Sequence, residues 1–108
     1  MKKTSKLILI TTLIISILGL ASCMKKPMAC VDSATKSGTV GQSISFDASC
    51  SMDAKHFEWE FGDGATASGS SALVTHAYNS IGTYTARVKA MSKNMKKESE
   101  KLITVTVN

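Results

Sequence analysis

Apolar and polar residues alternate most strictly over residues 57–61. Aromatic side chains occupy the odd positions of this segment, and Glu58 and Glu60 occupy the even ones. Because successive side chains of a β-strand point to opposite faces, the pattern predicts a strand with an aromatic, buried face and an acidic, solvated one. The next residues, Gly62-Asp63-Gly64, predict a tight turn, since glycine accepts positive φ and aspartate bonds its own backbone.

Segments of the same period recur along the chain. Strands are predicted over 29–35, 43–48, 57–61, 73–78, 83–91 and 102–107. Residues 65–71 predict a loop or a weak edge segment, Ser37-Gly38 a turn, and 92–97 a basic hairpin loop. Beyond the first 22 residues we find no helical period. Short strands at this spacing, about seven in number, predict an all-β sandwich.

The first 22 residues differ from the rest in charge and hydropathy. Three lysines precede residues 7–20, a run of 14 residues without a charge. Spanning a bilayer takes about 20 apolar residues, so the run favours a helical secretory signal over a transmembrane anchor. Leu20-Ala21-Ser22-Cys23 resembles the lipobox of bacterial lipoproteins, which implies acylation of Cys23 (by palmitate, for example) as the mature N-terminus. The alternative is a signal cleaved elsewhere, with Cys23 left as an ordinary thiol.

Removal of the signal changes what the composition implies. The whole chain has 13 basic and 8 acidic residues and a formal net charge of +5. Three of the lysines lie in the signal and no acid does, so the mature chain has a net charge of +2 and shows no nucleic-acid footprint. We therefore predict a signal peptide at 1–22, a lipidated tether at 23–28 and one domain at 29–108.

Cys30 and Cys50 form an even pair in a chain predicted to be exported, where disulfides persist. A small domain buries limited surface and often gains stability from a cross-link. A bridge over this separation would contribute about 3 kcal/mol. The alternative is two unpaired thiols, and the spacing is not the CxxC of metal sites.

Four pieces of the sequence resemble the PKD (polycystic kidney disease) domain family in order and spacing. They are Phe46-Asp47-Ala48-Ser49, Trp59-Glu60-Phe61-Gly62-Asp63-Gly64, His76-Ala77-Tyr78 and Gly82-Thr83-Tyr84-Thr85. The resemblance covers residues 29–108 and implies a seven-stranded immunoglobulin-like β-sandwich. Glu60 stands where the family more often has Asp, and Ile81 precedes Gly82 where Pro is common. The cysteine pair is found only in some members.

The motif residues have structural roles in this interpretation. We expect Trp59 to be the buried ring of the core. Tyr84 resembles a tyrosine corner, whose hydroxyl bonds backbone upstream while the ring packs; the alternative is an ordinary core tyrosine. The structural motif comprises Trp59, Phe61, Gly62, Asp63, Gly64, Tyr78, Gly82 and Tyr84.

Acidic residues and histidines are the candidates for chemistry. Glu58 and Glu60 would lie about 7 Å apart on one strand face, a separation that glycosidase carboxyl pairs also show. A solvated sheet face is the favoured interpretation, because so small a domain offers no evident deep pocket. Calcium ligands could come from Asp47, Asp53, Glu60 and Asp63, although no EF-hand spacing is present. His56 and His76 could bind zinc, yet His76 fits a packing role. We therefore predict a non-enzyme with no catalytic, cofactor-binding or metal-binding residue.

Lysines suggest how such a domain would face a membrane. The loop before the last strand of an immunoglobulin-like sandwich lies at the same end as the N-terminus. A membrane-facing basic patch would then contain Lys25, Lys26, Lys93, Lys96 and Lys97. The alternative is a solvated loop without a role, and the Gly62–Gly64 turn would point away from the membrane.

The resulting functional prediction is a lipid-anchored protein of the bacterial cell envelope, on the periplasmic or surface face of the outer membrane. Its single module would contact another envelope protein, with no nucleic-acid partner. The alternative is an accessory lipoprotein that binds carbohydrate or cell wall. That role calls for an exposed aromatic platform, for which Tyr78 is one of few candidates.

Overall fold

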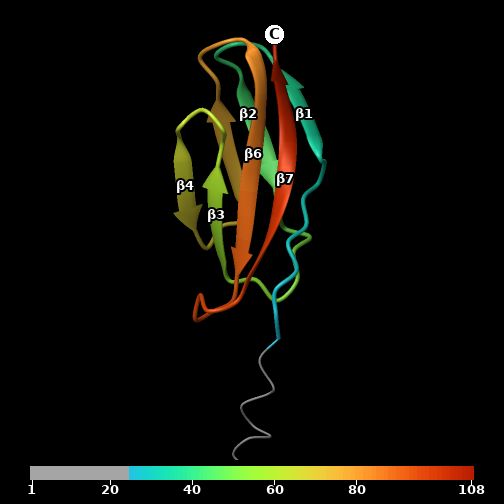
Figure 1. The fold of residues 1–108 in the computed structure, drawn as a ribbon, viewed down its shortest axis with the longest axis vertical. Helices are drawn as coiled ribbons and strands as arrows, with labels where there is room; N and C mark the ends of the chain where they lie inside the picture. The colour runs from blue at the N-terminus through green and yellow to red at the C-terminus, as the bar shows by residue number, and fades with distance from the viewer. Residues whose placement is uncertain (1–24) are drawn as a thin grey trace, which may run out of the picture.

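The computed structural model describes residues 25–108, which form a β-sandwich (Figure 1). The strands are β1 (Thr35–Gly38), β2 (Ser43–Asp47), β3 (His56–Glu60), β4 (Thr66–Gly69), β5 (Leu73–Ala77), β6 (Gly82–Met91) and β7 (Glu98–Val107). A five-stranded sheet in the order β1-β7-β6-β3-β4 packs on a two-stranded sheet of β2 and β5. The all-β fold class is confirmed. The predicted signal peptide and Cys23 lie outside the described residues.

Strand β3 has the two faces that its sequence predicted. Phe57 and Trp59 are buried, whereas Glu58 and Glu60 are exposed. β3 pairs antiparallel with β4 on one side and with β6 on the other. Trp59 contacts Phe46 of the opposite sheet, with 5.9 Å between ring centroids. The aromatic face of β3 therefore forms the centre of the core between the two sheets.

Strands β6 and β7 form the long hairpin of the domain. Each has ten residues, and they pair from Gly82 opposite Val107 to Met91 opposite Glu98. β7 begins four residues before the predicted start at 102. Its first residues are polar and exposed apart from Ser99, so no apolar alternation marks them, and it is the pairing with β6 that makes them a strand.

The strand predicted over 29–35 is wrong. β1 instead begins at Thr35 and runs parallel to β7, from Thr35 opposite Thr104 to Gly38 opposite Val107. Gly38, predicted as part of a turn, lies inside this strand, where a Cβ would come within 3.0 Å of the Ile44 side chain. Because Gly38 has no side chain, β1 can approach β2 closely. The prediction of a turn at this glycine was wrong.

Packing of the domain begins before the predicted boundary at residue 29. The Pro27 side chain is fully buried. Met28 and Met52 exchange two backbone hydrogen bonds, both of 3.0 Å, in an isolated antiparallel bridge. Two residues assigned to the tether therefore belong to the packed domain. In the described part of the chain, no helix has the length and apolar character that crossing a membrane requires.

Candidate binding surfaces

The glutamates of β3 belong to a ladder of alternating charge on the outer face of the five-stranded sheet. Arg87 of β6 lies opposite Glu60 and donates a hydrogen bond to it. The second guanidinium nitrogen of Arg87 lies 3.6 Å from Glu100 of β7. The hydrogen bond to Glu60 and the charge of that carboxylate raise the pKa of Arg87. Glu58, one step along, faces Lys89. These pairings are typical of a solvated sheet face, on which each glutamate lies opposite a basic side chain.

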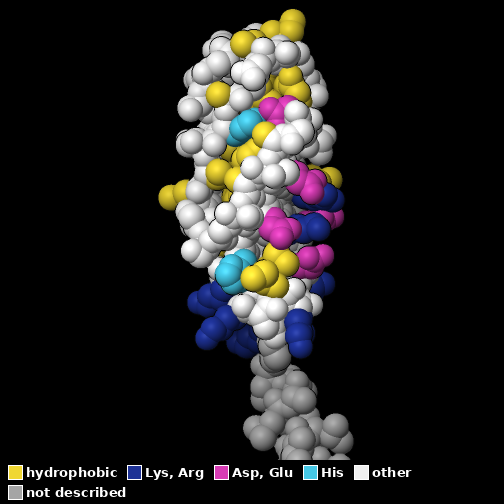
Figure 2. Space-filling model, turned by 90° about the vertical axis from the view of Figure 1, so that its left-hand side faces the viewer, with side chains coloured by type: hydrophobic (Ala, Val, Ile, Leu, Met, Phe, Trp, Pro, Cys, Tyr) yellow, Lys and Arg dark blue, Asp and Glu magenta, His cyan; other side chains and the backbone are white. Residues whose placement is uncertain are grey.

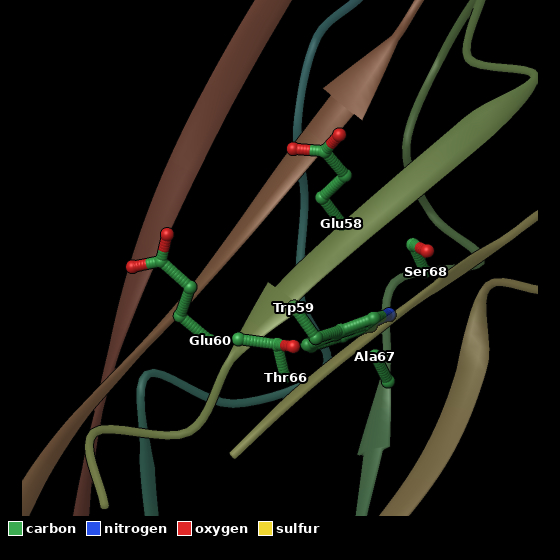
Figure 3. Close-up of a pocket in the computed structure, with 6 residues that line it drawn as sticks. All are labelled: Glu58, Trp59, Glu60, Thr66, Ala67 and Ser68. Carbon is green, nitrogen blue, oxygen red and sulfur yellow. The ribbon is translucent and has the colours of Figure 1, made fainter. Parts of the chain in front are cut away.

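A shallow depression of about 250 Å³ follows the β3–β4 edge (Figure 3). Its lining is Glu58, Trp59, Glu60, Thr66, Ala67 and Ser68. In Figure 3 the two carboxylates extend to one side of β3, and the Trp59 ring lies on the other side. The two carboxylates therefore lie on the solvated face of β3, away from the buried ring of Trp59.

Asp63, predicted as a turn residue, also anchors a cluster of rings. It accepts a hydrogen bond of 3.1 Å from the Ala65 N–H, and its second oxygen lies 2.7 Å from His76 Nε2. His76 stacks on Phe61 at 4.1 Å between centroids and meets the edge of Tyr78 at 4.8 Å. Burial alone would raise the pKa of Asp63, but the bonds from His76 and Ala65 outweigh it and lower the pKa. The cluster packs the β3–β4 turn against β5.

The candidate metal ligands each have another partner or lie apart. Asp47 accepts a hydrogen bond of 2.8 Å from the Ser49 N–H, and hydrogen bonds from Ser49 lower the pKa of Asp47. Asp63 is bound to His76, and Glu60 to Arg87. Within residues 25–108, no three histidine, cysteine or acidic side chains are grouped as metal ligands.

The chain's aromatic side chains do not form an exposed platform. All six lie in the described segment, and five are buried: Phe46, Phe57, Trp59, Phe61 and Tyr78. The sixth, Tyr84, is half-buried against the core. Tyr78, the platform candidate from the sequence, is 0% exposed and donates a hydrogen bond of 2.8 Å to the Phe61 carbonyl. Tyr84 donates one of 2.8 Å to the Ser80 carbonyl, the upstream bond predicted for a tyrosine corner.

The disulfide between Cys30 and Cys50 is confirmed, with 5.3 Å between their Cα atoms. It joins the segment that enters the domain to the loop after β2. Ser51 strengthens the junction, because its hydroxyl accepts a hydrogen bond from the Cys30 N–H and donates one to the Cys30 carbonyl. With the Met28–Met52 bridge, these bonds fix the entering chain against the sandwich.

Lysines gather at the end where the chain enters the domain. The Lys55 N–H bonds the Met91 carbonyl at the end of β6, which brings the loop before β3 beside the β6–β7 loop. In Figure 1 that loop lies at the end where the described part of the chain begins, and Figure 2 shows Lys and Arg side chains clustered at this end. We call this surface the basic end: Lys25, Lys26, Lys55, Lys93, Lys96 and Lys97, all exposed, with exposed Met28, Met52 and Met95.

The opposite end of the domain has two turns without charged side chains, and it exposes aliphatic side chains. Residues 38–42 and 79–82 meet there, since the Gly41 N–H bonds the Tyr78 carbonyl at 2.9 Å. Val40 is 46% exposed and Ile81 72% exposed, and neither segment contains a charged residue. We call this surface the distal end. The sequence predicted that the Gly62–Gly64 turn points away from the membrane, but it did not identify Val40 and Ile81. The available signal was an isolated aliphatic residue in each of two turns.

Comparisons with known proteins agree with this architecture. A family model described as "PKD domain" matches residues 24–107. The PKD1 domain of the Vibrio cholerae metalloprotease PrtV is 20% identical with a TM-score of 0.58, over 78% of this chain and 99% of that one. The PKD1 domain of Vibrio anguillarum Epp is 22% identical with a TM-score of 0.60, over 78% of this chain and 95% of that one.

A further solved structure comes from a study of carbohydrate-binding modules of the β-sandwich superfamily. It aligns with a TM-score of 0.68 at 22% identity, over 78% of this chain. The match covers 35% of that chain, so the present chain spans about a third of it. At such identities the likeness establishes a shared fold.

Proposed function

Because this chain belongs to the PKD domain family, we propose that it is a non-catalytic contact module, anchored by lipid at Cys23 and bound through its distal end to another envelope protein. The observation that carries the proposal is the pair of exposed aliphatic side chains at that end. Val40 and Ile81 lie on neighbouring turns that contain no charged side chain, and interface cores are likewise depleted in charged residues. The ion pair between Glu60 and Arg87 argues against a catalytic role for that carboxylate.

The arrangement of the ends supports this role. Lipid at Cys23 would hold the entering end of the domain at the membrane, and the distal end would face outward. The two turns that carry Val40 and Ile81 are fixed by hydrogen bonds to neighbouring backbone, since Gly41 bonds Tyr78 and Val40 bonds Asn108. A preorganised surface loses little conformational entropy on binding.

Photo-crosslinking in the native envelope tests the contact. A photoreactive residue at Ile81 should give one discrete protein adduct, whereas the same residue at Thr104, exposed on β7, should not. Val40→Asp with Ile81→Asp should abolish the adduct without changing the amount of folded protein. Equal adducts from both positions, or an adduct that survives the two aspartates, would contradict the proposal.

The anchor has its own test. Labelled fatty acid should be incorporated into the wild-type protein and not into Cys23→Ser, and the wild type should fractionate with envelope membranes. Incorporation into the serine variant, or none into the wild type, would sink the lipidation part of the proposal while leaving the distal contact to be judged by crosslinking.

A carbohydrate-binding accessory role is the second candidate, favoured by the likeness to a solved carbohydrate-binding module. With the aromatic rings internal, the surface for it would be the β3–β4 depression, where Glu60, Thr66 and Ser68 offer hydrogen-bonding groups to sugar hydroxyls. Retention on isolated cell-wall polysaccharide that is lost in Thr66→Ala with Ser68→Ala would favour this role. Retention that is unchanged in that double variant would exclude the depression.

A further inference from the structure

The charge of the domain is divided between its ends. The basic end contains six lysines and two acids, Asp53 and Glu98, whereas the rest of residues 25–108 has four basic and six acidic side chains. A domain with this asymmetry turns its basic end toward an anionic surface. The same end exposes three methionines, Met28 at 65%, Met52 at 61% and Met95 at 54%. Exposed apolar side chains among lysines are the combination by which peripheral proteins bind lipid headgroups.

The β6–β7 loop presents its side chains from a fixed backbone. Ser92 and Asn94 hold it, because the Met95 N–H bonds the Ser92 carbonyl at 2.8 Å and the Lys96 N–H bonds the Asn94 side chain at 3.1 Å. Met95 has a φ of +58°, a conformation that a non-glycine residue seldom adopts. The loop thus places an exposed methionine at its tip between Lys93 and Lys96.

The length of the tether brings this surface within reach of a membrane. Packing begins at Pro27, so four peptide units separate it from Cys23. Fully extended, they span about 14 Å. Electrostatic attraction in physiological salt decays over about 8 Å. Even with the tether stretched, the lysines would lie within roughly two such decay lengths of the membrane surface.

We infer that the basic end docks onto anionic phospholipid headgroups of the membrane that holds the anchor, with Met95 inserted among them. This inference rests on the proposed lipid anchor, and it adds a second contact that fixes the orientation of the domain. Each basic residue near such a surface strengthens attachment roughly fivefold. Docking therefore favours an upright domain with the distal end outward.

Lysine footprinting of the full lipidated protein on vesicles tests the docking. On phosphatidylcholine mixed with phosphatidylglycerol, acylation of Lys93 and Lys96 should slow at least roughly fivefold relative to phosphatidylcholine alone. High salt should remove the difference, because it screens the attraction. Lys36 serves as the internal control, because it lies in β1, outside the basic end, and is paired with Asp32. It should react equally on both vesicles.

Variants separate docking from a general effect of charge. Lys93→Glu with Lys96→Glu should remove the protection of Lys55 on anionic vesicles, whereas Lys36→Glu with Lys89→Glu, an equal change in net charge, should keep it. Met95→Asn, which tolerates the positive φ, should weaken the protection. Equal footprints on the two vesicles, or equal loss in the control variant, would overturn the inference.

Failure of the anchor would be visible separately. Flotation with neutral vesicles depends on the acyl chains, whereas the difference between neutral and anionic vesicles depends on the basic end. A protein that does not float with neutral vesicles contradicts the proposed anchor. A protein that floats but shows no charge-dependent footprint contradicts the docking alone.

Discussion

The ring centroids of Tyr78 and Tyr84 lie 4.5 Å apart, yet the two hydroxyls donate hydrogen bonds in different environments. The Tyr78 hydroxyl is buried and bonds the Phe61 carbonyl, 17 residues away in sequence. The Tyr84 hydroxyl bonds the exposed carbonyl of Ser80, which lies in the turn just before β6. Burial raises the pKa of Tyr78 to about 12, so it keeps its proton, and with it the hydrogen bond, at any physiological pH.

Tyr78→Phe should lower the free energy of unfolding by about 1–2 kcal/mol, because it leaves the Phe61 carbonyl buried without a donor. Tyr84→Phe is the matched control and should cost less, since water can replace the lost hydroxyl at the exposed Ser80 carbonyl. Urea denaturation of both variants at neutral pH gives the comparison. A larger loss in the Tyr84 variant would show that the buried bond is not the stronger one.

At the scale of elements, the turn after β3 depends on two glycines, one of which lies against β6. Gly62 has a φ of +86°, and a Cβ there would lie 2.6 Å from the Thr85 carbonyl oxygen of β6. Gly64 has a φ of +95° with open space around it. Gly62 is therefore required both by the left-handed backbone and by the close approach of the turn to β6. Gly64 is required by the left-handed backbone alone.

Gly62→Ala should therefore destabilise the domain by about 3 kcal/mol or more, because backbone strain adds to a clash with β6. Gly64→Ala should cost about 1 kcal/mol from the positive φ alone. Thermal or urea unfolding of the two variants measures the difference. Equal costs would mean that the turn moves away from β6 and absorbs the added methyl group.

At the scale of the whole molecule, the disulfide determines how rigidly the domain follows its N-terminal segment. Cys30 lies in the entering chain and Cys50 in the loop that carries Met52. The disulfide, the Met28–Met52 backbone bridge and the buried Pro27 therefore all hold the entering chain against the sandwich. A force or torque applied through the tether would reach the sandwich through this junction. The disulfide thus connects the proposed anchor to the orientation of the domain.

Replacement of both cysteines by serine should lower the free energy of unfolding by about 3 kcal/mol. Hydrogen exchange should become faster at the Met28 and Met52 amides, because the disulfide keeps their mutual hydrogen bonds in place. The amide of Val88, in the core of β6, serves as the control and should lose protection only in proportion to global stability. Unchanged exchange at Met28 would show that Pro27 and the backbone bridge alone hold the entering segment.

The sequence predicted some surfaces well and missed others for identifiable reasons. Strict alternation identified the faces of β3, since side-chain parity in a strand depends on local geometry alone. The parallel pairing of β1 with β7 joins segments far apart in sequence, and β1 has no apolar alternation of its own. The exposed aliphatic pair at the distal end was not predicted, because Val40 and Ile81 lie in separate turns that only the folded chain brings together.

By itself, the sequence determined the fold class, the buried aromatic face of β3 and the cysteine pair, because each depends on local periodicity, on family motifs or on the chemistry of a few residues. Tertiary structure decided where β1 runs, that Tyr78 is internal, and that Asp63 binds His76. It also decided that lysines and methionines from three segments share one end while two aliphatic turns share the other. Those facts depend on contacts between distant segments, which no local pattern encodes.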